Sequence, residues 1–510
     1  MDEGGDIIGA SSSVLHNFCL INAMSYQRAP ELGNVDCGEG EEVRLEEGEE
    51  EGSYSVKNNG ETMSSNKRMK EMSVDRLSAL PDSLIIHILS FLDLRVKKAA
   101  VTSVLSKRWQ FLWSELPGLN FWDRSLESDK VRDFVSWVHR TLLLRTGTYL
   151  KQFEVDFYYD ESYALDVNAW VRFAVKSKVK ELDLGLHSHI HFYTLPQVLY
   201  SNSSLQSLRV RRCILAPHRT IEWHSLTQLS IGDVKLNEDV IQKILSGCPL
   251  LYSLRLISCW GFKRLEVLSE TIQDLMVLDS DDKSILDLMD ISSPFLQTLH
   301  VSFSPLGKKL QLTNIASIVS ADIHFTELDK SAVVVINTME LLEKTKHAKD
   351  LILRGACIEV LSECVVRGWR LPHSSKRNLL VLETWRDEDS IPGILGLLES
   401  SPNLEKFLVE CCDSYKKSVR AWRSPARNDL DCDLLRLKKV RFIDYADPNL
   451  GGEPMLMLAR ILLKRATALE KMVIDALEGL TQYSSEFTKM SQTVLSYPKS
   501  SEKAVIVLRQ

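Results

Sequence analysis

The chain has 510 residues, a length that accommodates two or three domains with a sizeable core. Its hydrophobic content of 44% and charged content of 26% are ordinary for a globular protein. Its net charge of −7 provides no overall positive field that would attract nucleic acid. No apolar run reaches the ~18 residues that a membrane span needs. The 10 cysteines form no CxxC pair, so we read them as reduced intracellular thiols and not as zinc ligands or a disulfide framework.

Residues 1–71 lack a periodic apolar pattern and are predicted to be disordered, because they bury too little apolar surface to offset the entropy of ordering. Nine acidic residues lie between positions 36 and 51 and carry much of the net charge. They are Asp36, Glu39, Glu41, Glu42, Glu46, Glu47, Glu49, Glu50 and Glu51. A short basic stretch, 66–70, is compatible with nuclear import, although a solvated tail is the simpler interpretation.

Two apolar sets at helical spacing occupy residues 73–118. Pro81 and Asp82 favour the first turn of a helix, and Pro117 ends the second set. The sets are Leu80, Leu84, Ile85, Ile88, Leu89 and Leu92, followed by Ala99, Ala100, Val104, Trp109, Leu112 and Trp113. So short a unit buries too little surface to be stable alone, which predicts that it offers apolar surface to a partner.

This segment resembles the F-box, the helical module that docks onto the Skp adaptor of cullin-RING ubiquitin ligases. The resemblance rests on Leu80-Pro81, Ile88, Phe91-Leu92 and the string TSVLSKRW at 102–109, which looks like the plant-type version. It implies a set of adaptor-binding residues: Leu80, Pro81, Ile85, Ile88, Leu89, Leu92, Val104 and Trp109. The alternative is a generic amphipathic hairpin packed on the rest of the chain.

A leucine-rich-repeat region is predicted for residues 122–355, and it opens with a helical linker at 122–150. The pattern LxxLxL recurs at 179–184, 205–210, 226–231, 251–256, 272–277 and 296–301. Its central leucines are 21 to 26 positions apart, which is the period of leucine-rich repeats. Alternation along each strand turns one row inward, so Leu208, Leu229, Leu254, Leu275 and Leu299 should form one buried stack. Residues 237–249 predict a helix of the return side, and Cys213 and Cys259 are expected to be packing groups.

The repeat loosens after residue 320. A longer helix is predicted at 331–347, and strands are predicted at 351–353, 379–382, 407–409 and 440–442. A helix and a strand follow at 453–474. This segment, especially LEKMVI at 469–474, and the closing SEKAVIV at 501–507 resemble the FBD domain found at the end of many plant F-box proteins. We assign 376–510 to an FBD-like region, with a plain further repeat as the alternative.

The predicted fold class is therefore α/β: a short helical F-box, an irregular leucine-rich-repeat solenoid and a C-terminal α/β cap after a disordered N-terminus. The sequence contains no phosphate-binding loop of the form GxxxxGK[ST], no nucleophile elbow of the form GxSxG and no zinc-protease motif HExxH. His187, His189 and His191 alternate, but no Cys or carboxylate with ligand spacing lies near them, so a solvated loop is the simpler interpretation. We expect a non-catalytic protein without cofactor or metal.

The strand register also predicts which side chains face away from the stack. Arg209, Arg211, Arg255 and His300 should lie on neighbouring strands of that face and are the candidate substrate-binding residues. Three arginines there suit acidic or phosphorylated partners, because guanidinium pairs well with planar or multi-oxygen anions. An ordinary solvated sheet face is the alternative.

The resemblance implies a substrate-recognition subunit of an Skp–cullin–F-box E3 ubiquitin ligase. The expected partners are an Skp-family adaptor, through it the cullin and RING subunits, and a protein substrate, with no nucleic acid and no membrane. The expected location is the cytoplasm, the nucleus or both. Two alternatives are a non-degradative Skp-binding scaffold and a small-molecule sensor whose ligand lies in a deep, polar-lined pocket of the repeat face.

Overall fold

The computed structural model describes residues 80–91, 100–188, 190–278, 287–305, 308–385, 388–412, 429–443, 453–475 and 484–509. The chain divides into residues 1–74 and residues 75–510, and every described residue lies in the second part. The segment 1–71, predicted to be disordered, lies outside the described residues. Among the helices that are described, none is both long and apolar enough to cross a membrane.

The first described elements are short helices with a small core of their own. Helix α2 (Asp82–Phe91) is followed by two 3-10 helices, η1 (Thr102–Val104) and η2 (Leu112–Glu115). The buried side chains of this core are Ile85, Leu89, Trp109, Leu112 and Leu116. The backbone carbonyl of Pro81 accepts from the amides of Leu84 and Ile85, as expected for a residue at the start of a helix.

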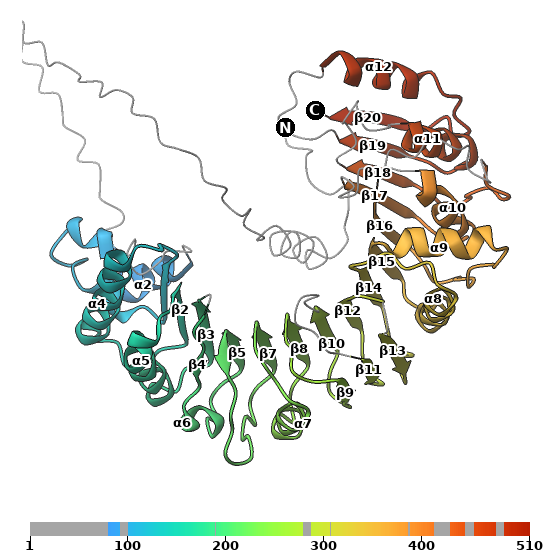
Figure 1. The fold of residues 1–510 in the computed structure, drawn as a ribbon. Helices are drawn as coiled ribbons and strands as arrows, with labels where there is room; N and C mark the ends of the chain where they lie inside the picture. Colours follow the sequence, from blue (N-terminus) through green and yellow to red (C-terminus); the bar gives the residue numbers. More distant parts are fainter. Residues whose placement is uncertain are drawn as a thin grey trace, which may run out of the picture. The chain divides into compact units, whose positions relative to one another are not determined.

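Fifteen strands of the described residues form one sheet, called the main sheet below, in which all the paired neighbours are parallel. Figure 1 shows the strands following one another in sequence order. They are β1 (Gly118–Asp123), β2 (Gln152–Tyr158), β3 (Glu181–His187), β5 (Ser207–Arg211), β7 (Gln228–Gly232), β8 (Ser253–Ile257), β10 (Asp274–Leu278), β12 (Thr298–Phe303), β14 (Ser320–Phe325), β15 (Asp350–Gly355), β16 (Leu379–Trp385), β17 (Lys406–Cys412), β18 (Lys439–Ile443), β19 (Lys471–Asp475) and β20 (Val505–Arg509).

The segments that connect one strand of the main sheet to the next, called the return segments below, differ along the chain. Helices α4 (Ser128–Leu144), α5 (Ala164–Lys176), α6 (Gln197–Tyr200) and α7 (Glu238–Gly247) serve the first strands, and β4 (Tyr193–Thr194) pairs with β6 (Cys213–Ile214). A second sheet of β9 (Arg264–Leu268), β11 (Leu288–Ser292) and β13 (Lys309–Thr313) then replaces helices. Helices α8 (Ala332–Thr345), α9 (Cys357–Val366), α10 (Ile391–Glu399), α11 (Glu453–Arg465) and α12 (Ser484–Leu495) follow. Figure 1 shows α5, α7, α8 and the second sheet on the same side of the main sheet.

The core lies between the main sheet and these return segments. Leu208, Leu229, Leu254, Leu275 and Leu299 are each at most 2% exposed and stand at matching register positions of β5 to β12, which confirms the predicted stack. Each strand gives alternate side chains to this core, as a period of two requires. Cys213 and Cys259 are buried packing groups, as predicted.

Several predicted elements are confirmed with small shifts in their ends. The side chain of Asn237 accepts from the amide of Val240, which caps α7, and Ser331 caps α8 in the same way. The predicted helical linker is only partly right. It contains α4, but β1 precedes it and is the first strand of the main sheet. That strand was missed because it begins at Gly118, on the boundary that we drew for the F-box.

The face of the main sheet opposite the core, called the non-core face, changes in character along the sheet. On β5 the Arg209 side chain is 63% exposed, whereas on β15 the Arg354 side chain is 3% exposed. Four apolar side chains are also buried on this face, in one register row of β15 to β19. They are Ile352, Val381, Leu408 and Val473. In this register row the side chains are therefore buried from β10 to β17, whereas those on β2 to β8 are exposed or half-buried.

Candidate functional site

The F-box segment presents an apolar surface. The apolar arc of helix α2 has a buried half and an exposed half: Ile85 and Leu89 are buried in the small core, whereas Leu84 and Ile88 are 46% and 43% exposed. Four more large apolar side chains of the segment are exposed. They are Val101, Val104, Leu105 and Phe111. Six exposed apolar side chains within so short a stretch mark an interaction surface, called the F-box surface below.

An ion pair joins the two halves of this segment. The Nε of Arg108 donates to Oδ1 of Asp82 at 2.6 Å, and its Nη2 donates to the carbonyl of Leu80. The second helical stretch is thereby tied to the first turn of α2, next to the residues that carry the F-box surface. Because both partners are well exposed, this pair orients the segments more than it stabilises them.

The predicted adaptor-binding residues fall into three groups. Pro81, Ile88 and Val104 are exposed, and Leu80 is half-buried. Ile85, Leu89 and Trp109 lie in the small core, at 1%, 4% and 8% exposure. Leu92 lies outside the described residues. The F-box surface also contains four residues that were not among the predicted adaptor-binding residues: Leu84, Val101, Leu105 and Phe111. The helical spacing of Leu84 and Ile88 would have indicated the first of them.

The predicted substrate-binding residues share the non-core face. Arg209, Arg255 and His300 lie in one register row across β5, β7, β8, β10 and β12, and Arg211 stands one row further along β5. Each arginine already faces a carboxylate. Arg209 Nη1 is 2.7 Å from Asp183 Oδ2, Arg211 Nε is 3.6 Å from Asp233 Oδ2 and Arg255 Nη2 is 3.4 Å from Asp274 Oδ2.

His300 differs from the prediction, which had it turned outward. It occupies the expected row but is only 3% exposed, and its Nδ1 lies 3.2 Å from Oδ2 of Asp322 on the next strand. The Nε2 of His300 has no hydrogen-bond partner among the described residues. Alternation identified the face of the sheet, but it carries no information on how deeply that part of the face is buried.

Asp322 and Arg354 form a buried ion pair beside His300. Burial works to raise the pKa of Asp322, but Arg354 and His300 outweigh it and hold the pKa below its ordinary value. Burial likewise works to lower the pKa of Arg354, whereas Asp322 and Glu383 raise it above the usual value. This pair was missed, and the signal was present: Arg354 directly follows the predicted strand 351–353.

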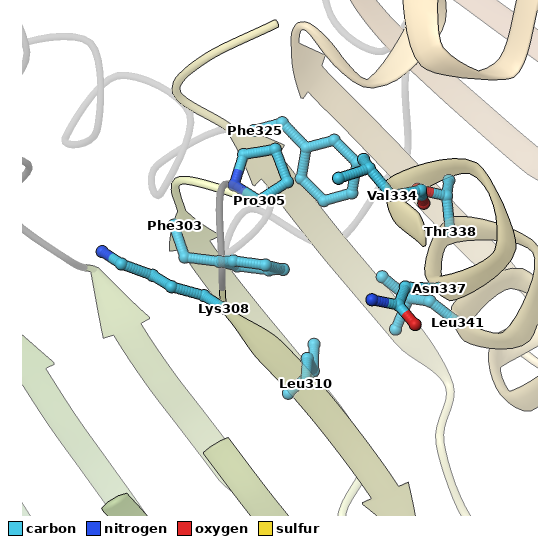
Figure 2. Close-up of a pocket in the computed structure, with 9 residues that line it drawn as sticks. All are labelled: Phe303, Pro305, Lys308, Leu310, Phe325, Val334, Asn337, Thr338 and Leu341. Atoms are coloured by element: carbon cyan, nitrogen blue, oxygen red, sulfur yellow. The ribbon is translucent and has the colours of Figure 1, made fainter. Parts of the chain in front are cut away.

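One recess lies where the return segments change from the second sheet to helix α8 (Figure 2). It measures about 300 Å³, including space open to solvent, and lies between the ends of β12 and β14, the strand β13 and helix α8. Its lining is mainly apolar: Phe303, Pro305, Leu310, Phe325, Val334 and Leu341, with Lys308, Asn337 and Thr338. Because α8 belongs to the core side, this is not the polar-lined pocket of the non-core face that a sensor requires.

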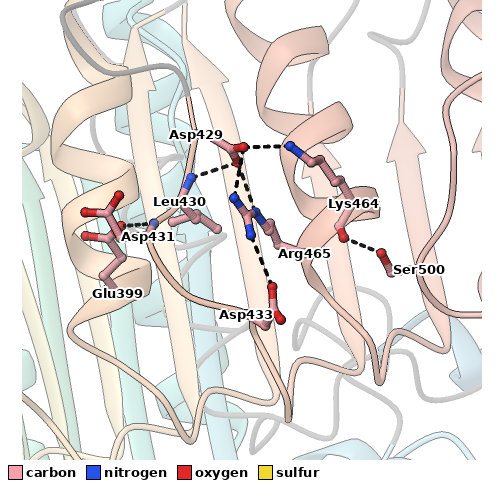
Figure 3. Close-up of polar contacts among 8 residues, drawn as sticks. All are labelled: Glu399, Asp429, Leu430, Asp431, Asp433, Lys464, Arg465 and Ser500. Carbon is pink, nitrogen blue, oxygen red and sulfur yellow. Dashed lines mark hydrogen bonds and ion pairs between the residues drawn. The ribbon is translucent and has the colours of Figure 1, made fainter.

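A polar network ties the C-terminal return segments together (Figure 3). Asp429 accepts from Lys464 Nζ at 2.7 Å and from Arg465 Nη2 at 3.0 Å, and Glu399 at the end of α10 accepts from the amide of Asp431. Arg465 and Lys464 lower the pKa of Asp429. We read this network as structural, because its charges are satisfied by one another.

The two described histidines of the histidine-rich loop lie near aspartates. His187 Nε2 lies 3.0 Å from Asp156 Oδ1, His191 lies 3.5 Å from Asp160, and His189 lies outside the described residues. In the described part of the chain, no group of three or more His, Cys, Asp or Glu side chains is placed to hold a metal ion.

Both the F-box segment and the repeat region match known protein families. Residues 77–120 match the F-box domain, and residues 142–510 match the leucine-rich-repeat domain of the At1g61320/AtMIF1 family. The chain is similar to the putative F-box/LRR-repeat protein At5g02930 of Arabidopsis thaliana, with 29% identity over 87% of this chain and 96% of that protein. It is 30% identical to the putative F-box protein At1g49610 of the same plant, over 68% and 86% of the two chains. The FBD-associated F-box protein At1g66310 is 27% identical over 80% and 91%.

Proteins with this pair of domains are generally non-catalytic adaptors. The leucine-rich-repeat match covers well over half of the sequence and lies after the F-box match along the chain. The exposed apolar surface of the F-box and the single long parallel sheet agree with this organisation. The chain belongs to the plant F-box/leucine-rich-repeat family.

Proposed function

We propose that this chain is the substrate-recognition subunit of an Skp–cullin–F-box E3 ubiquitin ligase, with the F-box surface bound to an Skp-family adaptor. The observation that carries the proposal is the F-box surface itself, where Ile88 and Val104 are exposed beside the small core that holds Ile85 and Trp109. The four predicted residues that are exposed or half-buried, Leu80, Pro81, Ile88 and Val104, contact the adaptor. The buried ones keep the helices in place beneath them.

The target protein binds the non-core face of the main sheet. Of the four candidate residues, Arg209, Arg211 and Arg255 are accessible, whereas burial gives His300 a supporting role. The protein acts without chemistry of its own: it holds a target near the ubiquitin-carrying enzyme, so that proximity supplies the rate. Residues 376–510 form an FBD-like region, a proposal supported by the similarity to an FBD-associated F-box protein. The proposed location is the cytoplasm, the nucleus or both.

The test is co-purification of the full-length chain with an Skp-family adaptor and cullin. The double variant Ile88→Asp, Val104→Asp should abolish capture of the adaptor, because two charges then face an apolar partner. Leu143→Asp is the matched control, since Leu143 is 84% exposed on α4, outside the F-box. Undiminished capture by the double variant would refute the proposal. Capture of the adaptor without cullin would favour a non-degradative scaffold.

A further inference from the structure

Three lysines stand side by side on the non-core face of the C-terminal strands. Lys406 of β17 is in register with Lys439 of β18, which is in register with Lys471 of β19. Their strand neighbours Phe407, Val440 and Met472 point into the core, so the lysines point away from it. We call these three residues the lysine ladder. All three are half-buried.

No ion pair within the described part of the chain neutralises the charge of the lysine ladder. Among the described residues, no carboxylate oxygen lies within the 4.0 Å of an ion pair of any of the three ammonium groups. Glu405, next to Lys406 in sequence, lies 3.4 Å from Lys438 instead. Asp350 stands two strands from Lys406, beyond Leu379 in the same row; burial raises the pKa of Asp350, and the charge of Lys406 acts against that rise without forming an ion pair. Like charges directly opposite each other on neighbouring strands destabilise a sheet, so the arrangement costs stability.

The arginines on the N-terminal strands of the same face differ from the lysine ladder, because they are paired with carboxylates. Arg209, Arg211 and Arg255 each have an aspartate within 3.6 Å, so an incoming anion has to compete with a carboxylate that is already in place. At the lysine ladder, an incoming anion has no ion pair among the described residues to compete with. Neighbouring strands are about 4.8 Å apart, so the ladder spans about 10 Å, and two alternate side chains of an extended peptide span about 7 Å.

We propose that the lysine ladder binds a phosphorylated segment of the target protein, with phosphates on alternate residues. This inference rests on the proposed function and deepens it, because it names the chemistry that the target must present. Three ammonium groups in a row suit the multiple oxygens of phosphate, and relief of the repulsion between the lysines adds to the affinity. A patch of three charges on a chain of net charge −7 is too small to follow a nucleic acid backbone.

The test measures binding of a fluorescein-labelled Gly/Ser peptide with two phosphoserines on alternate residues to the full-length chain in complex with its Skp-family adaptor. The triple variant Lys406→Gln, Lys439→Gln, Lys471→Gln should raise the Kd by roughly 30-fold or more, since charge-assisted contacts are lost. The triple variant Lys176→Gln, Lys344→Gln, Lys489→Gln is the matched control, since these lysines are exposed on helices α5, α8 and α12 and not on the non-core face. It removes the same charge and should change the Kd by no more than about twofold.

Thermal unfolding gives a second readout. The lysine variant should unfold at a higher temperature than the wild type, because repulsion is removed; a lower temperature would indicate a structural role and overturn the inference. The inference is also overturned if the unphosphorylated peptide, free phosphate or a single-stranded DNA binds as tightly as the phosphopeptide, or if the lysine variant keeps full affinity. These results concern only the lysine ladder: the proposed function is retained as long as the wild-type chain captures the adaptor. If the wild-type chain does not bind the adaptor, the proposed function is refuted, whatever the peptide does.

Discussion

Arg354 donates from Nε to Oδ1 of Asp322 at 3.0 Å, across the neighbouring strands β15 and β14, and both side chains are at most 5% exposed. Glu383 lies 3.6 Å from Nη1 of the same guanidinium. A second buried arginine, Arg377, is in the opposite situation. Its Nη1 donates to Ser401 Oγ, its Nε has no partner among the described residues, and burial lowers its pKa to about 10.

These two arginines should respond differently to replacement by methionine. Arg354→Met leaves the charge of Asp322 buried without its cation and should lower the free energy of unfolding by about 3–5 kcal/mol. Arg377→Met removes a charge that has no carboxylate partner among the described residues, and should change the free energy of unfolding by less than about 1.5 kcal/mol in either direction. Urea unfolding of both variants decides this. Equal losses of stability would contradict the assignment of the two environments.

Asp322 should also make stability depend on pH. Its pKa is lowered in the folded state, so its contribution is fully present above the ordinary value of about 3.9 and is lost as the pH falls through the lower folded-state pKa. Asp322→Asn should therefore lower the urea midpoint near pH 7, and the gap to the wild type should narrow in acid. A gap of constant size down to pH ~2 would mean that the carboxylate is not held ionised by Arg354.

The sequence predicts the strands of this fold well because alternation and a period of 21 to 26 residues leave little freedom for the central leucines. It predicts the functional surfaces less well. Leu84, Ile85, Ile88 and Leu89 form one continuous apolar arc of a helix, and spacing alone does not indicate which half is buried. Alternation likewise placed His300 on the correct face, but burial there depends on long-range packing.

The two sides of α2 should therefore separate stability from binding. Ile88→Ala, at a side chain that is 43% exposed, should weaken adaptor binding by about 2 kcal/mol and leave the fold unchanged. Ile85→Ala, at a side chain that is 1% exposed, should instead destabilise the small helical core by about 3 kcal/mol. Isothermal titration with the Skp-family adaptor and hydrogen exchange of residues 80–91 measure the two effects. If Ile85→Ala weakened binding with no increase in exchange, Ile85 would belong to the contact surface.

The register of the main sheet is tested at two adjacent residues of β8. Leu254 is 2% exposed in the core, whereas the side chain of Arg255 is 32% exposed on the non-core face. Leu254→Asp places an unpaired carboxylate in the stacked leucines, a cost of several kcal/mol that should unfold the neighbouring repeats. Arg255→Asp loses only a partly exposed ion pair with Asp274, and since such pairs contribute at most about 1 kcal/mol, the protein should remain folded. Circular dichroism and limited proteolysis compare the two variants. A folded Leu254→Asp protein would refute the stack of leucines. Position 254 would then have to lie on the non-core face, which requires a shift of the strand register by one residue.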